Sequence, residues 1–270
     1  MRKTFLALSL VVALTSGAFA QTGSESTNVL MADHKVMELG DKYLALLTNL
    51  YPEEATRLGT GIYHDQLLQR DKQSQITRNK SILALQNTLR EMNPKKLSPA
   101  KKAQYYVLLG QVNKKVFDEE VLNQTTKDPL WYLESLNSVY DIVEKNYATK
   151  EERLRDAIKR LEVLPQILEQ GQENIENAPD LRMRLAMQKT QVAYSSFDDL
   201  SAILTKMAST DQSREKINNV SKDAKEALKK YFDFLKANYS LSAFAFSAAA
   251  FDVAVKSSAI RADLPRKARK

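Results

Sequence analysis

A long one-sided helix in the middle of the chain is the feature that most constrains the fold. Between residues 154 and 175, apolar side chains recur at steps of three and four, which places them on one face of an α-helix. Pro165 lies inside this run and removes one helical hydrogen bond, so we predict a kink there rather than an end. Gly171 falls on the same face and would let another backbone approach closely. The apolar residues of this face are Leu154, Ile158, Leu161, Leu164, Leu168 and Ile175.

Such a helix needs other helices to cover it, and the composition favours them. Leu, Ala, Lys, Gln and Glu are abundant, whereas 7 Gly and 7 Pro are few for 270 residues. We predict an all-α fold, a single irregular bundle of about eight helices with one kinked at Pro165. The expected helices cover residues 29–50, 72–92, 98–122, 128–143, 150–175, 179–207, 210–238 and 242–260, with a short helix or turn at 52–61 and a polar loop at 123–128.

The N-terminus has the pattern of a secretory signal. Arg2 and Lys3 precede an apolar run over residues 4–14, and Ala18-Phe19-Ala20 is a small-x-small cleavage site. We predict a signal peptide over residues 1–20, a disordered lead-in over 21–28 and a helical domain over 29–260. The alternative is an uncleaved anchor, although the apolar run is short for a membrane span. The expected location of the mature chain is therefore periplasmic or extracellular, without a transmembrane segment.

Charge and cysteine content narrow the possible partners. The chain has no cysteine, so packing alone must hold an exported fold of this kind together. Cleavage of the signal lowers the net charge from +7 to +5, and much of the excess lies in a basic tail over residues 261–270. Such a tail either contacts acidic lipid or is simply solvated. Export makes nucleic acid an unexpected partner.

No catalytic constellation is recognisable. The two histidines, His34 and His64, stand without a second ligand at metal-binding spacing, and we interpret both as surface or capping residues. Gly59-Thr60-Gly61 is explained by a turn, and no Gly-x-Ser-x-Gly nucleophile motif occurs. We therefore predict no catalytic, cofactor-binding or metal-binding residue, and no cofactor.

Two apolar features are candidates for binding. Aromatic residues gather in the third and fourth long helices, where they line a ligand groove or, as the alternative, form core with a polar tip at the surface. The stretch that begins at Leu241 and ends at Ile260 is apolar on two opposite faces and carries no charge from residue 240 through 251. One of its faces is a candidate surface for self-association or for a protein partner. The groove candidates are Tyr105, Trp131 and Tyr132, and the candidate interaction surface is Phe246, Ala250 and Val253.

Four segments together resemble a bacterial family, domain of unknown function 885. Residues 52–59, Pro-Glu-Glu-Ala-Thr-Arg-Leu-Gly, resemble its "P-x-x-A-T-x-L-G" element, and Asp-Pro-Leu-Trp-Tyr-Leu at 128–133 is similar to its "D-P-x-x-Y-L" step. Residues 160–175 resemble its "R-L-x-x-x-P-x-x-L" helix, and 224–235 its "A-x-x-A-L-x-x-x-x-x-F-L" segment. The resemblance implies a largely helical, often exported protein whose full-length relatives look like zinc metallopeptidases with a His-Glu-x-x-His helix in the C-terminal half.

No residue of this sequence matches that zinc motif, so the resemblance transfers no site. The leading hypothesis is an exported, non-catalytic helical binding or scaffold protein, a truncated or stand-alone N-terminal half of the family. Two alternatives stay open. One is a hydrolase whose carboxylate site is assembled from distant Asp and Glu residues, and the other is a periplasmic chaperone or adaptor.

Overall fold

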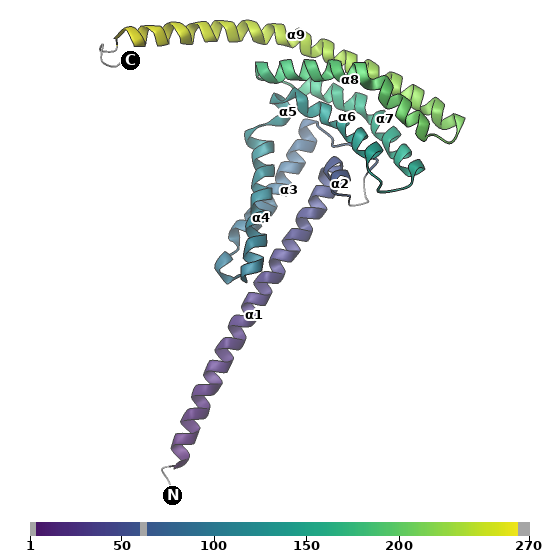
Figure 1. Ribbon diagram of the computed structural model, residues 1–270. Helices are drawn as coiled ribbons and strands as arrows, with labels where there is room; N and C mark the ends of the chain where they lie inside the picture. The colour runs from purple at the N-terminus through teal and green to yellow at the C-terminus, as the bar shows by residue number, and fades with distance from the viewer. Residues whose placement is uncertain (1–3, 60–63, 264–270) are drawn as a thin grey trace. The chain divides into compact units, whose positions relative to one another are not determined.

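The computed structural model describes the backbone of residues 4–59 and 64–263, and the side chains of residues 27–59 and 64–239. Within these ranges the chain is helical and has no β-strand, which confirms the predicted all-α fold class (Figure 1). The elements are α1 (Thr4–Leu50), α2 (Pro52–Leu58), α3 (Lys72–Glu91), η1 (Pro94–Lys96), α4 (Pro99–Val116), η2 (Phe117–Val121), α5 (Gln124–Lys127), α6 (Pro129–Glu144), α7 (Lys150–Asn174), α8 (Asp180–Met207) and α9 (Asp211–Asp263).

Contacts divide the chain into two compact units, the first of which combines residues 1–46 with 79–117. It holds the greater part of α1, most of α3, the short η1 and α4. Polar contacts connect these segments: the Ser98 N–H donates to the Asp33 carboxylate at 3.0 Å, and the Tyr105 hydroxyl donates to the Leu89 carbonyl at 3.2 Å. Its buried apolar residues are Val36, Leu39, Tyr43, Ile82, Leu85, Leu89, Leu97, Tyr105, Leu108 and Val112.

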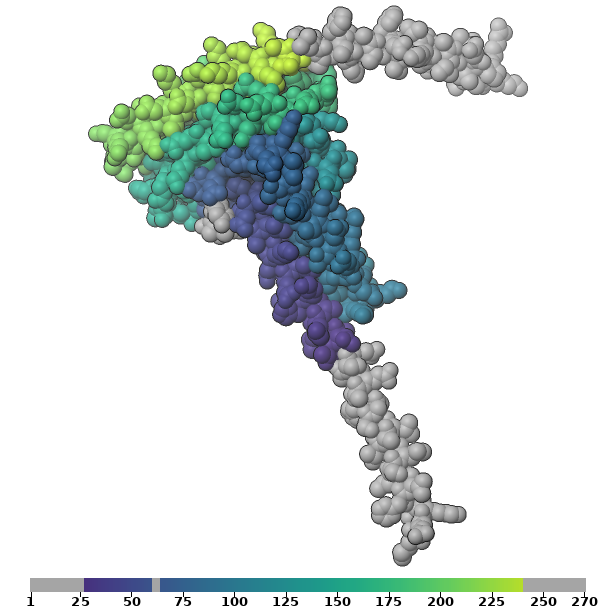
Figure 2. Space-filling view, turned by 180° about the vertical axis from the view of Figure 1, so that it is seen from behind, coloured from purple at the N-terminus to yellow at the C-terminus, as the bar shows by residue number. Residues whose placement is uncertain are grey.

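The second unit combines residues 47–78 with 118–270 and contains the larger core. Here α6 packs on α7 and α8, and α9 packs on α8 and α7 (Figure 1). Figure 2 shows the described part of α9 at the molecular surface beside α8. Fully buried residues of this core include Tyr132, Val139, Ile142, Leu161, Leu164, Ile167, Phe197, Leu200, Ile217, Leu228 and Tyr231.

The central helix α7 begins at a capping box. The Thr149 hydroxyl accepts from the Glu152 N–H, and the Glu152 carboxylate accepts from the Thr149 N–H at 3.0 Å. The helix then continues through Pro165 to Asn174, as predicted. All of the predicted apolar face is buried except Ile175, which is partly buried. The bend at Pro165 stays a prediction.

Several predicted starts are confirmed, and one predicted end is wrong. Ser98 and Asp128 cap α4 and α6 with proline as the next residue. The third long helix extends close to the predicted residue 122, but only its part through Val116 is α-helical, and the π-helical turn η2 continues it through Val121. The predicted break near residue 238 is wrong: α9 is one helix through Asp263, since neither Gly nor Pro occurs at 238–242 to end it.

The predicted signal peptide and most of the lead-in fall on residues 1–26, whose side chains lie outside the described residues, so these stay predictions. The tail at 261–270 also lies outside the residues whose side chains are described. That residues 29–260 form one domain stays a prediction as well.

Candidate functional site

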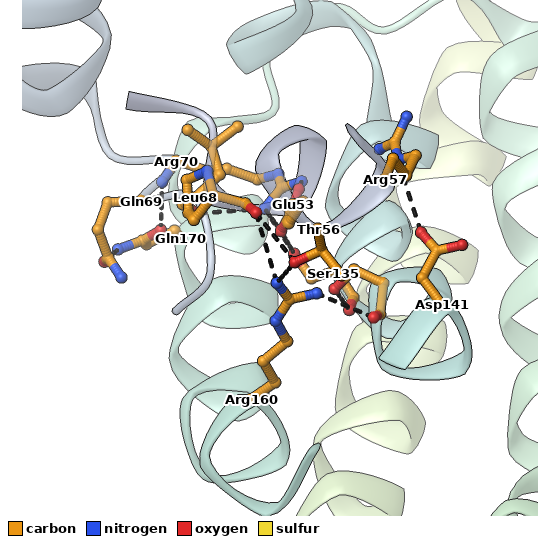
Figure 3. A network of polar contacts seen from close by, with 12 residues as sticks. Glu53, Thr56, Arg57, Leu68, Gln69, Arg70, Ser135, Asp141, Arg160 and Gln170 are labelled. Atoms are coloured by element: carbon orange, nitrogen blue, oxygen red, sulfur yellow. Dashed lines mark hydrogen bonds and ion pairs between the residues drawn. The ribbon is translucent and has the colours of Figure 1, made fainter. Parts of the chain in front are cut away.

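A buried ion pair between Glu53 of α2 and Arg70 lies at the centre of the polar contacts in the second unit (Figure 3). The guanidinium donates from Nη2 to Glu53 Oε2 at 2.8 Å and from Nη1 to Oε1 at 3.0 Å, a bidentate arrangement. Ser135 of α6 joins the pair, because its hydroxyl accepts from Arg70 and donates to Glu53 Oε1 at 3.1 Å. Glu53 is 4% exposed and Arg70 1% exposed, so both charges are almost completely desolvated.

The carboxyl of Glu53 stays ionised in spite of its burial. Burial alone would raise its pKa, but the charge and hydrogen bonds of Arg70, with a smaller effect of Arg160 and the Ser135 hydroxyl, hold the pKa below its ordinary value. The pair is therefore charged at neutral pH, and each partner depends on the other for its stability in the interior.

The backbone of Arg70 is fixed by α7. Its N–H donates to the Gln170 side chain at 2.9 Å, and its carbonyl accepts from the Asn174 amide at 2.9 Å. The residues that lead from α2 toward α3 are thus attached to the end of α7 by main-chain hydrogen bonds as well as by the ion pair.

A second buried guanidinium, that of Arg160 on α7, binds the other side of α2. Arg160 is 0% exposed and donates to the Thr56 hydroxyl at 2.5 Å and to the Ser138 carbonyl at 2.9 Å. The Thr56 hydroxyl also lies 3.0 Å from Nδ1 of His64 and 3.1 Å from the Pro52 carbonyl. One hydroxyl therefore connects α2, α7 and the segment that carries His64.

The Thr56 hydroxyl pairs with Nδ1 of His64 in either tautomer of the ring, because it accepts from a protonated Nδ1 and donates to a bare one. With its proton directed to the Pro52 carbonyl, the hydroxyl oxygen accepts from both Arg160 and His64. In that arrangement Nδ1 of His64 carries the proton and Nε2 has a free lone pair. Nε2 is buried and has no hydrogen-bond partner among the described residues.

The prediction that His64 lies at the surface is wrong, because the residue is 6% exposed; His34, in contrast, is exposed and lies 3.3 Å from Glu38. The His64 ring packs on Tyr147 with a centroid separation of 3.9 Å, and the Tyr147 hydroxyl donates to Asp156 at 2.9 Å. Burial lowers the pKa of His64, and the nearby Arg160 and Lys145 lower it further against the opposing effect of Asp156 and Asp65. His64 is consequently neutral at pH 7.

Acidification should weaken the fold through His64. Its pKa is lower in the folded than in the unfolded chain, so the unfolded state binds more protons at pH values between the two. The stabilisation from His64 is complete above the unfolded pKa of about 6.5, decreases as the pH falls below it, and amounts to about 1.4 kcal/mol for each unit of the depression. His64→Phe removes the titration but keeps an aromatic ring. Between pH 7 and 5, the free energy of unfolding measured with urea should fall more steeply with decreasing pH for the parent than for His64→Phe.

The same prediction can be checked directly. The chain has only two histidines, so a His34→Gln variant leaves the imidazole signals of His64 alone in an NMR titration. A His64 midpoint at or above about 6.5 would contradict the prediction.

A second buried ion pair joins Arg78 of α3 to Glu119 in η2. Arg78 donates from Nε to Glu119 Oε1 at 3.0 Å, and the Tyr51 hydroxyl donates to the same oxygen at 2.9 Å. The Trp131 ring lies between the two ion pairs, with the guanidinium carbons of Arg70 and Arg78 at 4.8 and 5.7 Å from its centroid. The side chain that the sequence proposed for a groove therefore stacks on two buried cations.

Within the described residues, no three His, Asp or Glu side chains lie close enough to hold a metal ion. Apart from Nε2 of His64, Thr125 Oγ1 and a few single atoms of Arg70, Arg153, Arg160, Asn79 and Asp180, the buried polar side-chain atoms of this part of the chain have hydrogen-bond partners. The cluster around Glu53 and Arg160 thus connects α2, α6 and α7 through an ion pair and hydrogen bonds.

A sequence profile described as "bacterial protein of unknown function (DUF885)" matches residues 52–264. The chain belongs to this family. The resemblance that the motifs indicated is therefore confirmed, and three of the four motif segments supply the buried contacts. The first provides Glu53 and Thr56 and ends at Gly59, whose φ of 70° suits glycine. The second provides Trp131, and the third Arg160.

The DUF885 chain is similar in fold to a solved structure from Shewanella oneidensis, that of a protein of unknown function described as a candidate lipoprotein. The two share 21% sequence identity with a TM-score of 0.68. The match covers 76% of this chain and 38% of the Shewanella chain, so this chain spans well under half of that protein's length. No curated protein matches.

Other sequence-predicted residues of the DUF885 chain are placed as follows. Tyr132 is fully buried and donates to the Thr125 carbonyl at 2.6 Å. Tyr105 is buried in the other compact unit. Both rings lie in a core, but neither polar tip is at the surface, because the Tyr105 hydroxyl also donates to a buried carbonyl, that of Leu89. Phe246, Ala250 and Val253 lie in the part of α9 whose side chains are outside the described residues. Among the helices that the structure describes, none has the length and hydrophobicity needed to cross a bilayer.

Proposed function

We propose that this DUF885 member is an exported, non-catalytic helical protein that works by binding another protein chain. The observation that carries the proposal is a row of exposed apolar side chains on α8. Leu181, Leu185 and Val192 are 59%, 37% and 60% exposed and follow one another at steps of four and seven residues. A soluble protein seldom leaves such a row of large apolar side chains uncovered unless something binds there.

The buried polar cluster supports the same proposal. Glu53, Arg70 and Arg160 are engaged with one another or with main-chain groups of α2 and α6, so their arrangement serves to hold helices together. Export is supported by the signal pattern in residues 1–20 and is compatible with the description of the Shewanella protein.

The second apolar feature is the stretch at 241–260. Its sequence has aromatic residues on two opposite faces of a helix and no charge from residue 240 through 251. Its uncharged part, the 12 residues from 240 through 251, is too short to span a bilayer. We propose that the face of Phe246, Ala250 and Val253 mediates self-association or contact with another chain.

Replacing Phe246 with Glu should weaken this association by placing a charge in an apolar contact. Light scattering on the mature chain over a range of concentrations measures the association, and a thermal melt reports the fold. We expect a lower mass at each concentration and an unchanged melting temperature. A parent that stays monomeric throughout and is destabilised by Phe246→Glu would place this face in the core and end the proposal.

The non-catalytic part of the proposal has its own test. One tightly bound zinc ion per chain in the purified mature protein would contradict it. So would peptide hydrolysis that disappears on replacing a single Asp or Glu while the fold remains intact.

A further inference from the structure

The connection from α3 to α4, which runs through η1, concentrates positive charge in the first compact unit (Figure 1). Residues 90–102 contain five cations and one carboxylate, that of Glu91, so this connection has a formal charge of +4. The basic tail at 261–270 carries the same charge, which leaves the rest of the mature chain slightly acidic. The five cations of the connection are Arg90, Lys95, Lys96, Lys101 and Lys102.

The structure leaves these cations open to solvent. All five are at least partly exposed, and none forms an ion pair with another residue in the described part of the chain. Lys101 donates to the neutral side-chain oxygen of Gln104 at 2.9 Å. The Asp33 carboxylate of α1 reaches the connection, where it accepts the Ser98 N–H at 3.0 Å. The positive charge is therefore available to an anionic partner outside the chain.

An exposed leucine of α1 lies beside the same connection. Because Asp33 contacts Ser98, the Asp33 side chain points toward the connection, and Leu30, three residues earlier, points within about 60° of that direction. Leu30 is 68% exposed. Lysines beside an exposed leucine are typical of surfaces that bind lipid bilayers, since the cations meet phosphate headgroups while the apolar side chain enters the interface.

The size of this surface favours a layer of lipid headgroups over a protein. A stable protein interface buries about 800 Å² on each partner around an apolar core. The connection is short and offers separate lysines beside one leucine rather than such a core. Anionic headgroups demand no match of shape, and each lysine contributes to binding on its own. Nucleic acid is an unexpected partner for an exported chain.

We propose that the α3–α4 connection at residues 90–102, together with Leu30, binds the anionic phospholipid headgroups of a membrane surface. This surface and this partner are additional to the protein contact proposed above. The contact is peripheral and mainly electrostatic, so salt screens it.

Co-sedimentation of the mature chain with phospholipid vesicles tests the proposal. We expect binding to phosphatidylcholine vesicles with about one-third phosphatidylglycerol, but not to phosphatidylcholine alone. The bound fraction should fall as salt rises from about 0.05 to 0.5 M. Lys95→Gln/Lys96→Gln should lower the partition coefficient about 30-fold, because each lysine at an anionic surface contributes about a factor of five. A thermal melt checks that this variant keeps its fold.

Lys42→Gln/Lys80→Gln is the matched control. Both lysines are exposed, belong to the same compact unit, and change the net charge by the same amount. Lys42 lies nine residues after Asp33 on α1, and Lys80 lies eleven residues before Glu91 on α3. Each is thus about 13 Å or more along its helix from the connection, beyond the screening length of about 8 Å, so the partition coefficient should change by about twofold or less. The basic tail is intact in every variant.

A fluorophore at position 30 reports the contact directly. The chain has no cysteine, so Leu30→Cys can be labelled at one site with a nitrobenzoxadiazole maleimide, which brightens in an apolar environment. We expect brightening with the anionic vesicles, and none for the same dye on Lys80→Cys. Equal losses in the two double variants, an unchanged partition coefficient for Lys95→Gln/Lys96→Gln, or a dye at position 30 that stays dark would each overturn the proposal. No binding to the anionic vesicles at low salt would overturn it as well, and would point to an acidic protein instead.

Discussion

Replacing Arg70 with Met is expected to lower the free energy of unfolding by about 3–5 kcal/mol at neutral pH. The change leaves the Glu53 carboxylate, 4% exposed, without its bidentate partner, and it also removes donors from the Leu68 carbonyl and the Ser135 hydroxyl. An unpaired charge in the interior costs far more than the pair itself contributes. Urea unfolding of the mature chain at fixed protein concentration measures the loss.

The pH dependence identifies the cause. Without Arg70 the pKa of Glu53 should rise, because burial then acts without the opposing cation. The decrease in the free energy of unfolding caused by Arg70→Met should therefore become smaller as acid protonates the carboxyl. The double variant Glu53→Leu/Arg70→Met should recover much of the stability. Arg57→Met is the matched control: Arg57 is half exposed, 3.6 Å from Asp141, and its removal should cost less than about 1 kcal/mol. Equal losses for the two arginines would contradict the interpretation.

Gly171→Ala is expected to destabilise the protein by about 2 kcal/mol, although alanine is the better helix former. A Cβ at position 171 would lie 2.9 Å from ring carbons of both Tyr132 and Tyr231. Both rings are fully buried and their hydroxyls are held, at 2.6 Å to the Thr125 carbonyl and 2.7 Å to the Pro129 carbonyl. The rings therefore have little freedom to move away.

Gly110→Ala in α4 supplies the control of opposite sign. A Cβ there meets nothing within 4 Å, so the helix preference for alanine should stabilise the protein by about 0.5–1 kcal/mol. Thermal or urea unfolding of the two variants side by side gives the comparison. If Gly171→Ala stabilised the protein, the rings of Tyr132 and Tyr231 would have to move away from the added Cβ at little cost, which would contradict the prediction.

The sequence predicted the all-α class and the principal helices because these follow from local patterns. The face of α7 repeats at helical spacing, its start carries a capping box, and the Ser-Pro and Asp-Pro pairs begin α4 and α6. It also located a close approach at Gly171, though the neighbours turned out to be two aromatic rings rather than a backbone.

The polar cluster could not be predicted in the same way. Glu53, Arg70 and Arg160 look like ordinary surface charges, and what buries them is the packing of α2 against α6 and of α6 against α7. Their partners lie far along the chain or in short segments without periodicity. His64 was misplaced for the same reason, since no local pattern distinguishes a histidine stacked on Tyr147 from one in solvent. The composition of 52–59, with its adjacent glutamates, gave no sign that one of them is buried.

The hydrogen bonds of α2 also constrain the order in which the protein can be assembled. Arg160 lies 104 residues after Thr56, and Gln170 lies 100 residues after Arg70. During synthesis the chain from Pro52 to Arg70 therefore emerges long before α7, and the Thr56 hydroxyl and the Arg70 backbone lack their α7 partners until α7 is complete. Contacts of such long range form late because the intervening chain must first be ordered. Residues 52–70 therefore reach their final contacts only after the middle of the chain has been made, and in that interval they are accessible to proteases and chaperones.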